Sequence, residues 1–421
     1  MTDIPSMISL EEARELVLSH IKPLPAETVP LLDALGRVAA ADVESDMDVS
    51  PFAHAAMDGF AVRSADLAKA SDDASAELDV IADVPAGSTY EGPIEAGQCV
   101  RIMTGAALPA DADAVVKYEI VETVAGDGKT GSRVRFAAPA KPGDNVRGAG
   151  EEAREGEIVL HAGEVIHPAG AGFLAGCGAT EAAVHRRPLV AIIPIGSELV
   201  EPPAKPGPGH IRNSNGYAMA ACARDAGAEC DILPIVADDE DLLAETVERA
   251  TKTYDFVVTT GGASNGDFDF IKPVVERLGT LHMTTVNMRP GKAQTFGIVN
   301  GTPVFGLPGN PAAAYMGFSL LIRPALRAMQ GYTALEHPHI RARITVSKKK
   351  KDPRRIFSRA TIRRGADGTL EVTPAKNQSS GLFGVIQKSN CVAIMPEGLD
   401  PVHEGDMVEC ILLDAPEETV L

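Results

Sequence analysis

The sequence lacks the features that mark secreted, membrane-spanning or nucleic-acid-binding proteins. Its six cysteines form no C-x-x-C pair, which argues against a zinc knuckle or a redox pair and favours buried, reduced thiols. No apolar run approaches the length of a membrane span, and the acidic N-terminus has no signal-peptide pattern. The net charge of −19 argues against general nucleic-acid binding, which depends on cations. We therefore expect a cytoplasmic protein with no membrane and no nucleic-acid partner.

The glycine-rich segment in the middle of the chain also lacks the residues of the common nucleotide-binding loops. A buried strand is predicted at residues 255–260, and Gly261, Gly262 and Gly266 follow it. A strand that runs into a glycine turn and a helix presents backbone N–H groups to an anion. Yet Asp267 stands where a P-loop has its lysine, and no G-x-G-x-x-G occurs in this segment.

Acids in this loop change the ligand that it can accept. Because carboxylates repel phosphate, a phosphate group could approach only with a divalent cation between them. Asp267 and Asp269 offer oxygen ligands, which suit Mg²⁺, and Mg²⁺ bridges readily to phosphate. The residues alone leave two interpretations open: a magnesium-assisted phosphate site, or a glycine-rich surface loop with solvated acids.

The N-terminal part of the chain predicts two amphipathic segments, to which we assign no chemistry. Residues 8–21 predict a helix that begins with a capping box formed by Ser9 and Glu12. A second amphipathic segment is expected at residues 31–35, ending at Gly36.

Composition and patterning predict several domains in this 421-residue chain. Short apolar runs broken by turns predict a small β-rich domain at residues 50–147, in which Asp58 alone reads most simply as a turn former. A strand and a small-residue helix at residues 155–178 then return the chain to its N-terminal part. The β-rich block is therefore expected to be inserted into a discontinuous helical linker domain of residues 1–49 and 148–186.

Residues 187–331 alternate strand and helix, which predicts a doubly wound, mostly parallel sheet. The expected strands are 188–195, 229–236, 255–260 and 302–311, and the expected helices are 213–227, 237–251 and one long helix at 311–331. Ligands of such sheets bind beyond the carboxyl ends of the strands. The carboxyl ends of these four strands carry Glu198, Asp238, the loop 261–269 and residues 308–311, so we expect them on one rim. Asp238 could also be the N-cap of its helix, a role that is compatible with a place in the site.

Residues 332–421 predict a compact β-barrel or sandwich of short strands. Residues 347–359 form the one strongly basic stretch of this acidic chain. They fit either a solvated hairpin or a clamp on a polyanionic ligand, with Arg359 as the candidate most embedded in a strand. The polar glycine loop at residues 377–384 could face the same ligand.

Six short motifs, taken together, resemble the molybdopterin molybdenumtransferase family, which comprises the bacterial MoeA proteins and the gephyrin E-domain. They are MDGFAV (57–62), RIMTGA (101–106), GSEL (196–199), TTGGASNGDFDF (259–270), RPGKA (289–293) and GLPGNP (306–311). Their order and spacing cover nearly the whole chain, which makes the resemblance specific. It implies a multidomain α/β plus β fold with the helical linker and inserted β-rich domains, a MoaB/Mog-like molybdopterin-binding α/β domain at 187–331, and a C-terminal β-barrel at 332–421.

The resemblance also implies a reaction and its partners. Adenylyl-molybdopterin and molybdate are the implied substrates; the phosphoanhydride is cleaved with Mg²⁺, AMP leaves, and molybdenum enters the dithiolene. A homodimer is implied, with the active cleft between the α/β domain of one subunit and the inserted domain of the other. A molybdopterin adenylyltransferase and acceptor molybdoenzymes, or their chaperones, are the implied protein partners.

The matching motifs also imply the site residues. The implied catalytic residues are Asp58, Thr104, Glu198, Asp238, Asp269 and Arg289. Of these, Glu198, Asp238 and Asp269 are the implied magnesium ligands. The implied substrate-binding residues are Gly261, Gly262, Ser264, Gly266, Lys292, Pro308, Gly309, Asn310, Pro311, Arg359 and Ser380. Arg289, Lys292 and Arg359 are expected to attract molybdate, itself a dianion.

Several departures from the family pattern keep alternatives open. Thr285 stands where a lysine is usual, Ile195 and Ser197 replace Thr and Asp of a T-G-D-E-L motif, and Ala149 lies where arginines are usual. They motivate a divergent or non-catalytic molybdopterin-binding scaffold with altered metal preference. A nucleotide hydrolase that resembles CinA only in the α/β domain is a third possibility, against which the other motifs count. The sequence does not distinguish molybdenum from tungsten.

Overall fold

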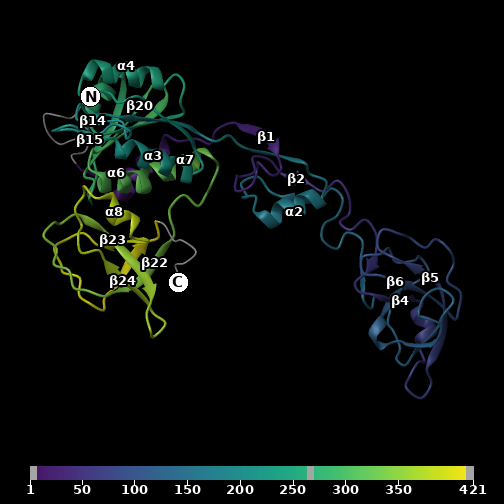
Figure 1. Ribbon diagram of the computed structural model, residues 1–421. Coiled ribbons are helices and arrows are strands. Elements are labelled where there is room, and N and C mark those ends of the chain that lie inside the picture. Colours follow the sequence, from purple (N-terminus) through teal and green to yellow (C-terminus); the bar gives the residue numbers. More distant parts are fainter. Residues whose placement is uncertain (1–6, 263–269, 414–421) are drawn as a thin grey trace. The chain divides into compact units, whose positions relative to one another are not determined.

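The computed structural model describes residues 7–262 and 270–413. The chain forms two compact units, Met1–Glu27 with Val184–Leu421, and Thr28–Ala183 (Figure 1). Each unit is described by itself below. The four-part division of the chain, with the boundaries given above, stays a prediction.

The larger unit contains a six-stranded sheet in the order β16-β13-β17-β21-β20-β18. The strands are β16 (Glu229–Ile232), β13 (Leu189–Pro194), β17 (Phe256–Thr260), β21 (Thr302–Leu307), β20 (Ala293–Val299) and β18 (Gly279–Thr285). The first four are parallel, which confirms the predicted doubly wound arrangement. The last two are antiparallel additions that the strand–helix rhythm did not predict. Asn300 and Gly301 both have positive φ, so they form the tight turn that reverses the chain between β20 and β21.

Helices cover both faces of this sheet, which explains why its central strands are buried throughout. The helices are α1 (Leu10–Ser19), α3 (Ser214–Asp225), α4 (Glu240–Ala250), α5 (Ile271–Leu278), α6 (Pro311–Gly317) and α7 (Arg323–Met329). Val190 and Ile192 of β13 pack with α1, α3, α6 and α7, whereas Ala191 and Ile193 pack with α4 and α5. This alternation follows from the two-residue period of a strand. The short strands β14 (Leu199–Val200) and β15 (Ile211–Arg212) pair beside the sheet.

Two predictions about the helices of this unit have different outcomes. The capping box of α1 is confirmed, because the Ser9 hydroxyl accepts from the Glu12 N–H at 3.1 Å and Glu12 Oε2 accepts from the Ser9 N–H at 2.8 Å. The single long helix predicted at 311–331 is instead α6, a π-helical turn (Phe318–Ile322) and α7. Pro324 explains the turn, since it has no N–H to offer the carbonyl of Leu320. That carbonyl accepts from Arg14 Nε at 3.4 Å.

The C-terminal strands close into a five-stranded barrel, as predicted. They are β23 (Arg355–Arg364), β24 (Leu370–Pro374), β22 (His339–Ile344), β26 (Met407–Ile411) and β25 (Cys391–Met395), and pairing of β25 with β23 closes the ring. The helix α8 (Phe383–Gln387) lies between β24 and β25 in the chain. The two-residue strand β19 (Met288–Arg289) comes from the α/β part and pairs with β23. Figure 1 shows α3, α6 and α7 between the sheet and the barrel.

The smaller unit is built on its own six-stranded sheet in the order β7-β4-β6-β5-β9-β8. The strands are β7 (Ala114–Lys117), β4 (Gly59–Val62), β6 (Gln98–Ile102), β5 (Ala76–Val84), β9 (Arg133–Phe136) and β8 (Glu122–Ala125), with 3-10 turns at Ser64–Leu67 and Tyr118–Ile120. Short ladders join β1 (Ala26–Pro30) to β12 (Glu181–His185), β2 (Val43–Glu44) to β11 (Ile158–Leu160) and β3 (His54–Ala55) to β10 (Val146–Arg147). The helix α2 (Pro168–Gly176) confirms the strand–helix pattern expected at 155–178.

The helix expected at residues 31–35 is wrong. The segment is a series of turns, and Leu32 is 82% exposed instead of lying on a buried face. Pro30 precedes it and Gly36 follows with positive φ, so too few residues remain between them for a stable helix. Within the described residues, the chain has no helix that is both long and apolar enough to cross a membrane.

Candidate functional site

Three neighbouring strand ends of the larger unit meet, as the sheet topology predicted. The Gly261 N–H after β17 donates to the carbonyl of Leu307 at the end of β21, at 3.1 Å. Gly261 has a φ of +89°, and a Cβ added there would lie 2.2 Å from the carbonyl oxygen of Ile195 after β13. Only glycine fits this approach, because the space is filled by backbone and the conformation is left-handed. The first two glycines of the predicted loop therefore serve close packing of the strand ends.

Asp238 is held in place by the residue that follows β13. Its Oδ2 accepts from the Ser197 N–H at 2.9 Å, and its own N–H donates to Ser197 Oγ at 3.0 Å. The N-cap of α4 is the next residue, Asp239, whose Oδ1 accepts from the Leu242 N–H. The predicted role of Asp238 as the N-cap is therefore wrong.

Glu198 lies beside this pair. A Cβ added at Gly196 would meet Glu198 Oε2 at 2.5 Å, so the carboxylate lies back over the strand end that carries Ser197. Carboxylate oxygens are the donors that Mg²⁺ prefers, so Glu198 and Asp238 fit the chemistry of that ion. In residues 7–262 and 270–413, however, no group of three or more His, Cys, Asp or Glu side chains is placed to hold a metal. Ser264, Gly266 and Asp269 lie outside the described residues, so the three-carboxylate set stays a prediction.

A cavity of about 660 Å³ between the α/β part and the barrel is lined by most of the cations of the basic stretch 347–359. We name it the cationic cleft. Six of its lining side chains are cationic and none of the lining residues in the described chain is acidic. The cations are Arg289, Lys348, Lys349, Lys351, Arg354 and Arg359. A solvated hairpin would scatter these charges, so their convergence favours the clamp on a polyanionic ligand.

Arg359 is the most buried cation of the cleft. It is 1% exposed, and burial lowers the pKa of its guanidinium. Its Nη2 donates to the carbonyl of Ser379 at 3.0 Å, whereas its buried Nε has no hydrogen-bond partner in the described chain. The next residue, Ser380, accepts from the Ala312 N–H at the start of α6. The loop at 377–384 is thus tied to both the barrel and the α/β part, and it lines the cleft as predicted.

Asp352 is a charged residue of this region that sequence reasoning missed. Its carboxylate accepts from Arg289 Nη1 at 3.1 Å and from Arg354 Nη2 at 2.5 Å. The hydrogen bonds from Arg354 hold the pKa of the Asp352 carboxyl far below its usual range. A single acid inside a run of lysines and arginines was the available signal, because such an acid has cations on both sides to orient.

A second cavity, of about 400 Å³, adjoins the cationic cleft. It shares three lining residues with the cleft, namely Gly291, Asn310 and Ala313, and it adds Lys292, Ala293, Pro308 and Gly309. Pro311 follows as the first residue of α6, with Asn310 as its N-cap. Gln294, which the sequence did not single out, is fully buried and donates from Nε2 to the carbonyl of Gly291 at 3.0 Å. It thereby supports the turn that presents Arg289 and Lys292.

The smaller unit brings together the two site residues predicted for it. Asp58 Oδ1 accepts from the Thr104 N–H at 2.8 Å and from Thr104 Oγ1 at 2.7 Å. These hydrogen bonds, with the Thr104 N–H as the larger cause, lower the pKa of the Asp58 carboxyl. Asp58 is therefore more than a turn former. Whether it shares a site with Asp238 stays a prediction.

Comparisons with known proteins cover nearly the whole chain. Residues 8–178 match the MoeA N-terminal region (domain I and II), residues 191–328 match a probable molybdopterin binding domain, and residues 341–413 match the MoeA C-terminal region (domain IV). The chain is 34% identical over 98% of its length to 98% of a Staphylococcus epidermidis protein named molybdopterin molybdenumtransferase. The chain belongs to the MoeA family.

Further MoeA relatives agree in sequence and in structure. A molybdopterin molybdenumtransferase of Bacillus subtilis (strain 168) is 36% identical, over 96% of this chain and 94% of its own. The crystal structure of a molybdopterin biosynthesis MoeA protein from Pyrococcus horikoshii OT3 matches with a TM-score of 0.82 at 28% identity, covering 97% of this chain and 100% of that one. Matches outside the α/β part contradict the alternative in which only that part is shared with a CinA-like hydrolase.

The departures from the MoeA motifs have clear places in the fold. Ser197 binds Asp238 in both directions, so the exchange of an acid for serine keeps the metal candidate oriented. Ile195 is 2% exposed and bridges to Val236, so it fills the packed strand end. Thr285 ends β18, and Ala149 is exposed in the smaller unit. None of these four residues lines the cationic cleft or the adjoining cavity.

Proposed function

We propose that this MoeA protein is a molybdopterin molybdenumtransferase that uses adenylyl-molybdopterin and molybdate as substrates. In the proposed reaction, the phosphoanhydride of the adenylylated pterin is cleaved, AMP leaves, and molybdenum enters the dithiolene. The convergence of carboxylates at strand ends with a cluster of cations in the adjoining cavities is the observation that supports it most. A phosphoanhydride and an oxyanion are both accommodated by this combination.

The cations are proposed to bind the molybdate dianion. Arg359 has the role of the anchoring residue, because its buried Nε has no acceptor among the described residues and a charged donor without a partner is costly. Arg289 and Lys292 stand at the two ends of the R-P-G-K turn and are proposed to attract the oxyanion and to stabilise charge as the anhydride is cleaved. Ser380 and residues 308–311 are proposed to line the same ligand.

The carboxylates are proposed to hold the diphosphate end of the substrate through magnesium. Glu198, Asp238 and Asp269 would bind the ion, which when bound neutralises the phosphate oxygens and bridges them to the protein. Ser197 orients Asp238 for this role by the two hydrogen bonds described above. Gly261 and Gly262, with Ser264 and Gly266, are proposed to keep the backbone close to the phosphates.

Asp58 and Thr104 are proposed to complete the site from a second copy of the chain, in a homodimer. The hydrogen bonds from Thr104 keep Asp58 ionised and therefore able to accept a proton or a hydrogen bond. Mixing Asp58→Ala subunits with Asp238→Ala subunits tests this arrangement. Activity recovered in the mixture, when each variant alone is inactive, is expected; no recovery from a mixed dimer would contradict it.

The deciding experiment is an assay of AMP release from adenylyl-molybdopterin, run without oxyanion, with molybdate and with tungstate. Release that requires the oxyanion and Mg²⁺ is expected, and release that ignores molybdate would overturn the proposal. A cytoplasmic site of action, with a molybdopterin adenylyltransferase upstream and molybdoenzymes or their chaperones downstream, belongs to the same proposal. A non-catalytic scaffold is not favoured, because the relatives that match over the full length are named as transferases.

A further inference from the structure

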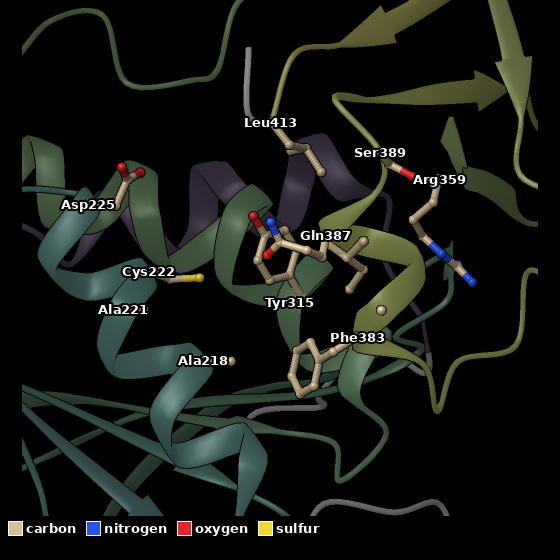
Figure 2. A pocket seen from close by; sticks show the side chains of 12 residues that line it. Ala218, Ala221, Cys222, Asp225, Tyr315, Arg359, Phe383, Gln387, Ser389 and Leu413 are labelled. Atoms are coloured by element: carbon tan, nitrogen blue, oxygen red, sulfur yellow. The ribbon is translucent and has the colours of Figure 1, made fainter. Parts of the chain in front are cut away.

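A third cavity, of about 490 Å³, lies between α3, α6 and α8 and has no role in the function proposed so far. We name it the aromatic slot. Ala218, Ala221 and Cys222 of α3 form one wall, and Tyr315 and Phe383 lie across from them (Figure 2). The walls are thus small aliphatic side chains on one side and flat rings on the other. Such a gap suits a planar ring system, which can stack on the aromatic faces.

The charged residues that line the slot are Asp225 and Arg359, and the neutral polar side chains of Gln387 and Ser389 also line it. Burial raises the pKa of the Cys222 thiol to about 12, so it stays neutral at physiological pH. In Figure 2, Asp225 lies at one side of the slot and Arg359 at the other. From Ala218 to Asp225, α3 extends the wall by roughly 10 Å at 1.5 Å per residue. A fused heterocycle of two or three rings fits that length.

Arg359 connects the slot to the cationic cleft, because it lines both cavities. Its side chain is 99% buried, and its Nε is without a hydrogen-bond partner in the described chain. A buried cation in this state lacks an acceptor that a ligand would supply. A molecule with its rings in the slot and an electron-rich group at Arg359 would therefore reach the place where the oxyanion is proposed to bind.

We propose that the aromatic slot binds the pterin ring of the substrate, with the aminopyrimidinone edge toward Asp225 and the dithiolene end toward Arg359. The chemistry of that edge supports the orientation, because its ring N–H and amino group together match the two oxygens of a carboxylate. The inference rests on the proposed function, since the pterin of that substrate carries the dithiolene that must reach the oxyanion. It assigns Asp225, Tyr315 and Phe383 to substrate binding, none of which the motifs indicated.

The test uses the full-length protein and pterin-6-carboxylate, a fluorescent pterin, as the probe. Ala221→Phe places a ring in the slot and is expected to weaken probe binding at least tenfold. Asp225→Asn, which removes charge but little volume, is expected to weaken it three- to tenfold. Ala169→Phe, at an exposed position of α2, and Glu245→Gln, an exposed acid of α4, are matched controls that should bind the probe like the wild type.

Three readouts separate this inference from the proposed function. Ala221→Phe should raise KM for adenylyl-molybdopterin while molybdate affinity and kcat change less than twofold, and its melting temperature should match that of Ala169→Phe. Unchanged probe affinity and KM in Ala221→Phe, alongside molybdate-dependent AMP release, would overturn the slot and leave the function standing. Displacement of the probe by AMP instead of by a neutral pterin would assign the slot to adenine and overturn the inference. Absence of AMP release from the wild type would instead refute the function.

Discussion

Two regions of the larger unit present opposite charges to an anionic ligand. At the strand ends, Glu198 and Asp238 present carboxylates, which repel a phosphate ligand unless a metal ion lies between them. In the cationic cleft, six basic side chains converge and can accept an oxyanion directly. The chain as a whole carries a net charge of −19, so this concentration of cations is a local feature and is not a product of composition.

The difference between these regions teaches that the charge of the protein can direct two anionic substrates to separate places. In the proposed reaction, the diphosphate of the adenylylated pterin would bind through a metal at the acids, and molybdate would bind the cations directly. Substitutions on the two sides should therefore change different kinetic constants. Four substitutions, from the largest expected effect to the smallest, test that separation.

Asp238→Asn should have the largest effect. The amide can still accept from the Ser197 N–H, but it loses the negative charge proposed for the metal, so kcat should fall by about 10²–10³ and the Mg²⁺ requirement should rise. Asp239→Asn is a matched control, because asparagine also caps helices well and activity should stay near that of the wild type. An Asp238→Asn enzyme with normal magnesium dependence would show that this side of the comparison is wrong.

Arg359→Ala should weaken the binding of molybdate in the cationic cleft. Loss of one charge-assisted hydrogen bond corresponds to about 10- to 100-fold in affinity, and we expect this as a higher KM for molybdate with an unchanged magnesium requirement. Arg363→Ala, four residues along the same strand and with a 72% exposed side chain, is the control. Equal effects of the two substitutions on the KM for molybdate would mean that general charge, and not the buried position of Arg359, attracts the oxyanion.

Asp352→Asn tests, through stability, the acid that pairs with Arg289 and Arg354 of the cationic cleft. The folded-state pKa of Asp352 is depressed, so its ion pairs should stabilise the wild type above the unfolded pKa of about 3.9, and this stabilisation should be lost as pH falls toward the folded pKa. We expect a loss of about 1–3 kcal/mol in the free energy of unfolding at pH 7. Urea titrations of both proteins at pH 7, 5 and 3.5 measure it. A difference that grows on acidification would contradict the ion-pair explanation.

Ser197→Ala should have the smallest effect. It removes the hydroxyl that accepts from the Asp238 N–H but keeps the Ser197 N–H that donates to the Asp238 carboxylate. A neutral hydrogen bond contributes about 0.5–1.5 kcal/mol, so kcat should fall by only a few fold. A rise in the KM for molybdate would indicate that Ser197 acts on the oxyanion instead of on Asp238.

Sequence patterns predicted the parts of the fold that depend on residues close together in the chain. The capping box at Ser9 and the four parallel strands were predicted from the residues, whereas the residues left a barrel or a sandwich open for the C-terminal strands and the family resemblance implied the barrel. The antiparallel strands β18 and β20 were missed because their pattern resembles other short apolar runs, although Asn300-Gly301 is a turn signal. The π-helical turn was missed because a helical period does not reveal where Pro324 frees a carbonyl.

The candidate site was predictable where it depends on topology and less so where it depends on packing. Parallel strands bring Glu198, Asp238 and Gly261 to one edge regardless of side-chain detail. The cationic cleft needed the placement of β23 beside β19, which no local motif encodes. Asp352 and Gln294 act by contacts with residues distant in the sequence, so their partners were visible only in the folded chain.

Two cations of the site, Arg289 of the strand β19 and Lys292, are linked to different parts of the larger unit. Met288 and Arg289 belong to the chain of the α/β part, but they pair with Arg355 and Ile356 of the barrel. Lys292, three residues after Arg289, directly precedes β20 and is therefore anchored to the central sheet. Arg289 is therefore tied to the barrel and Lys292 to the central sheet, so a tilt of the barrel against the sheet would change the distance between these two charges.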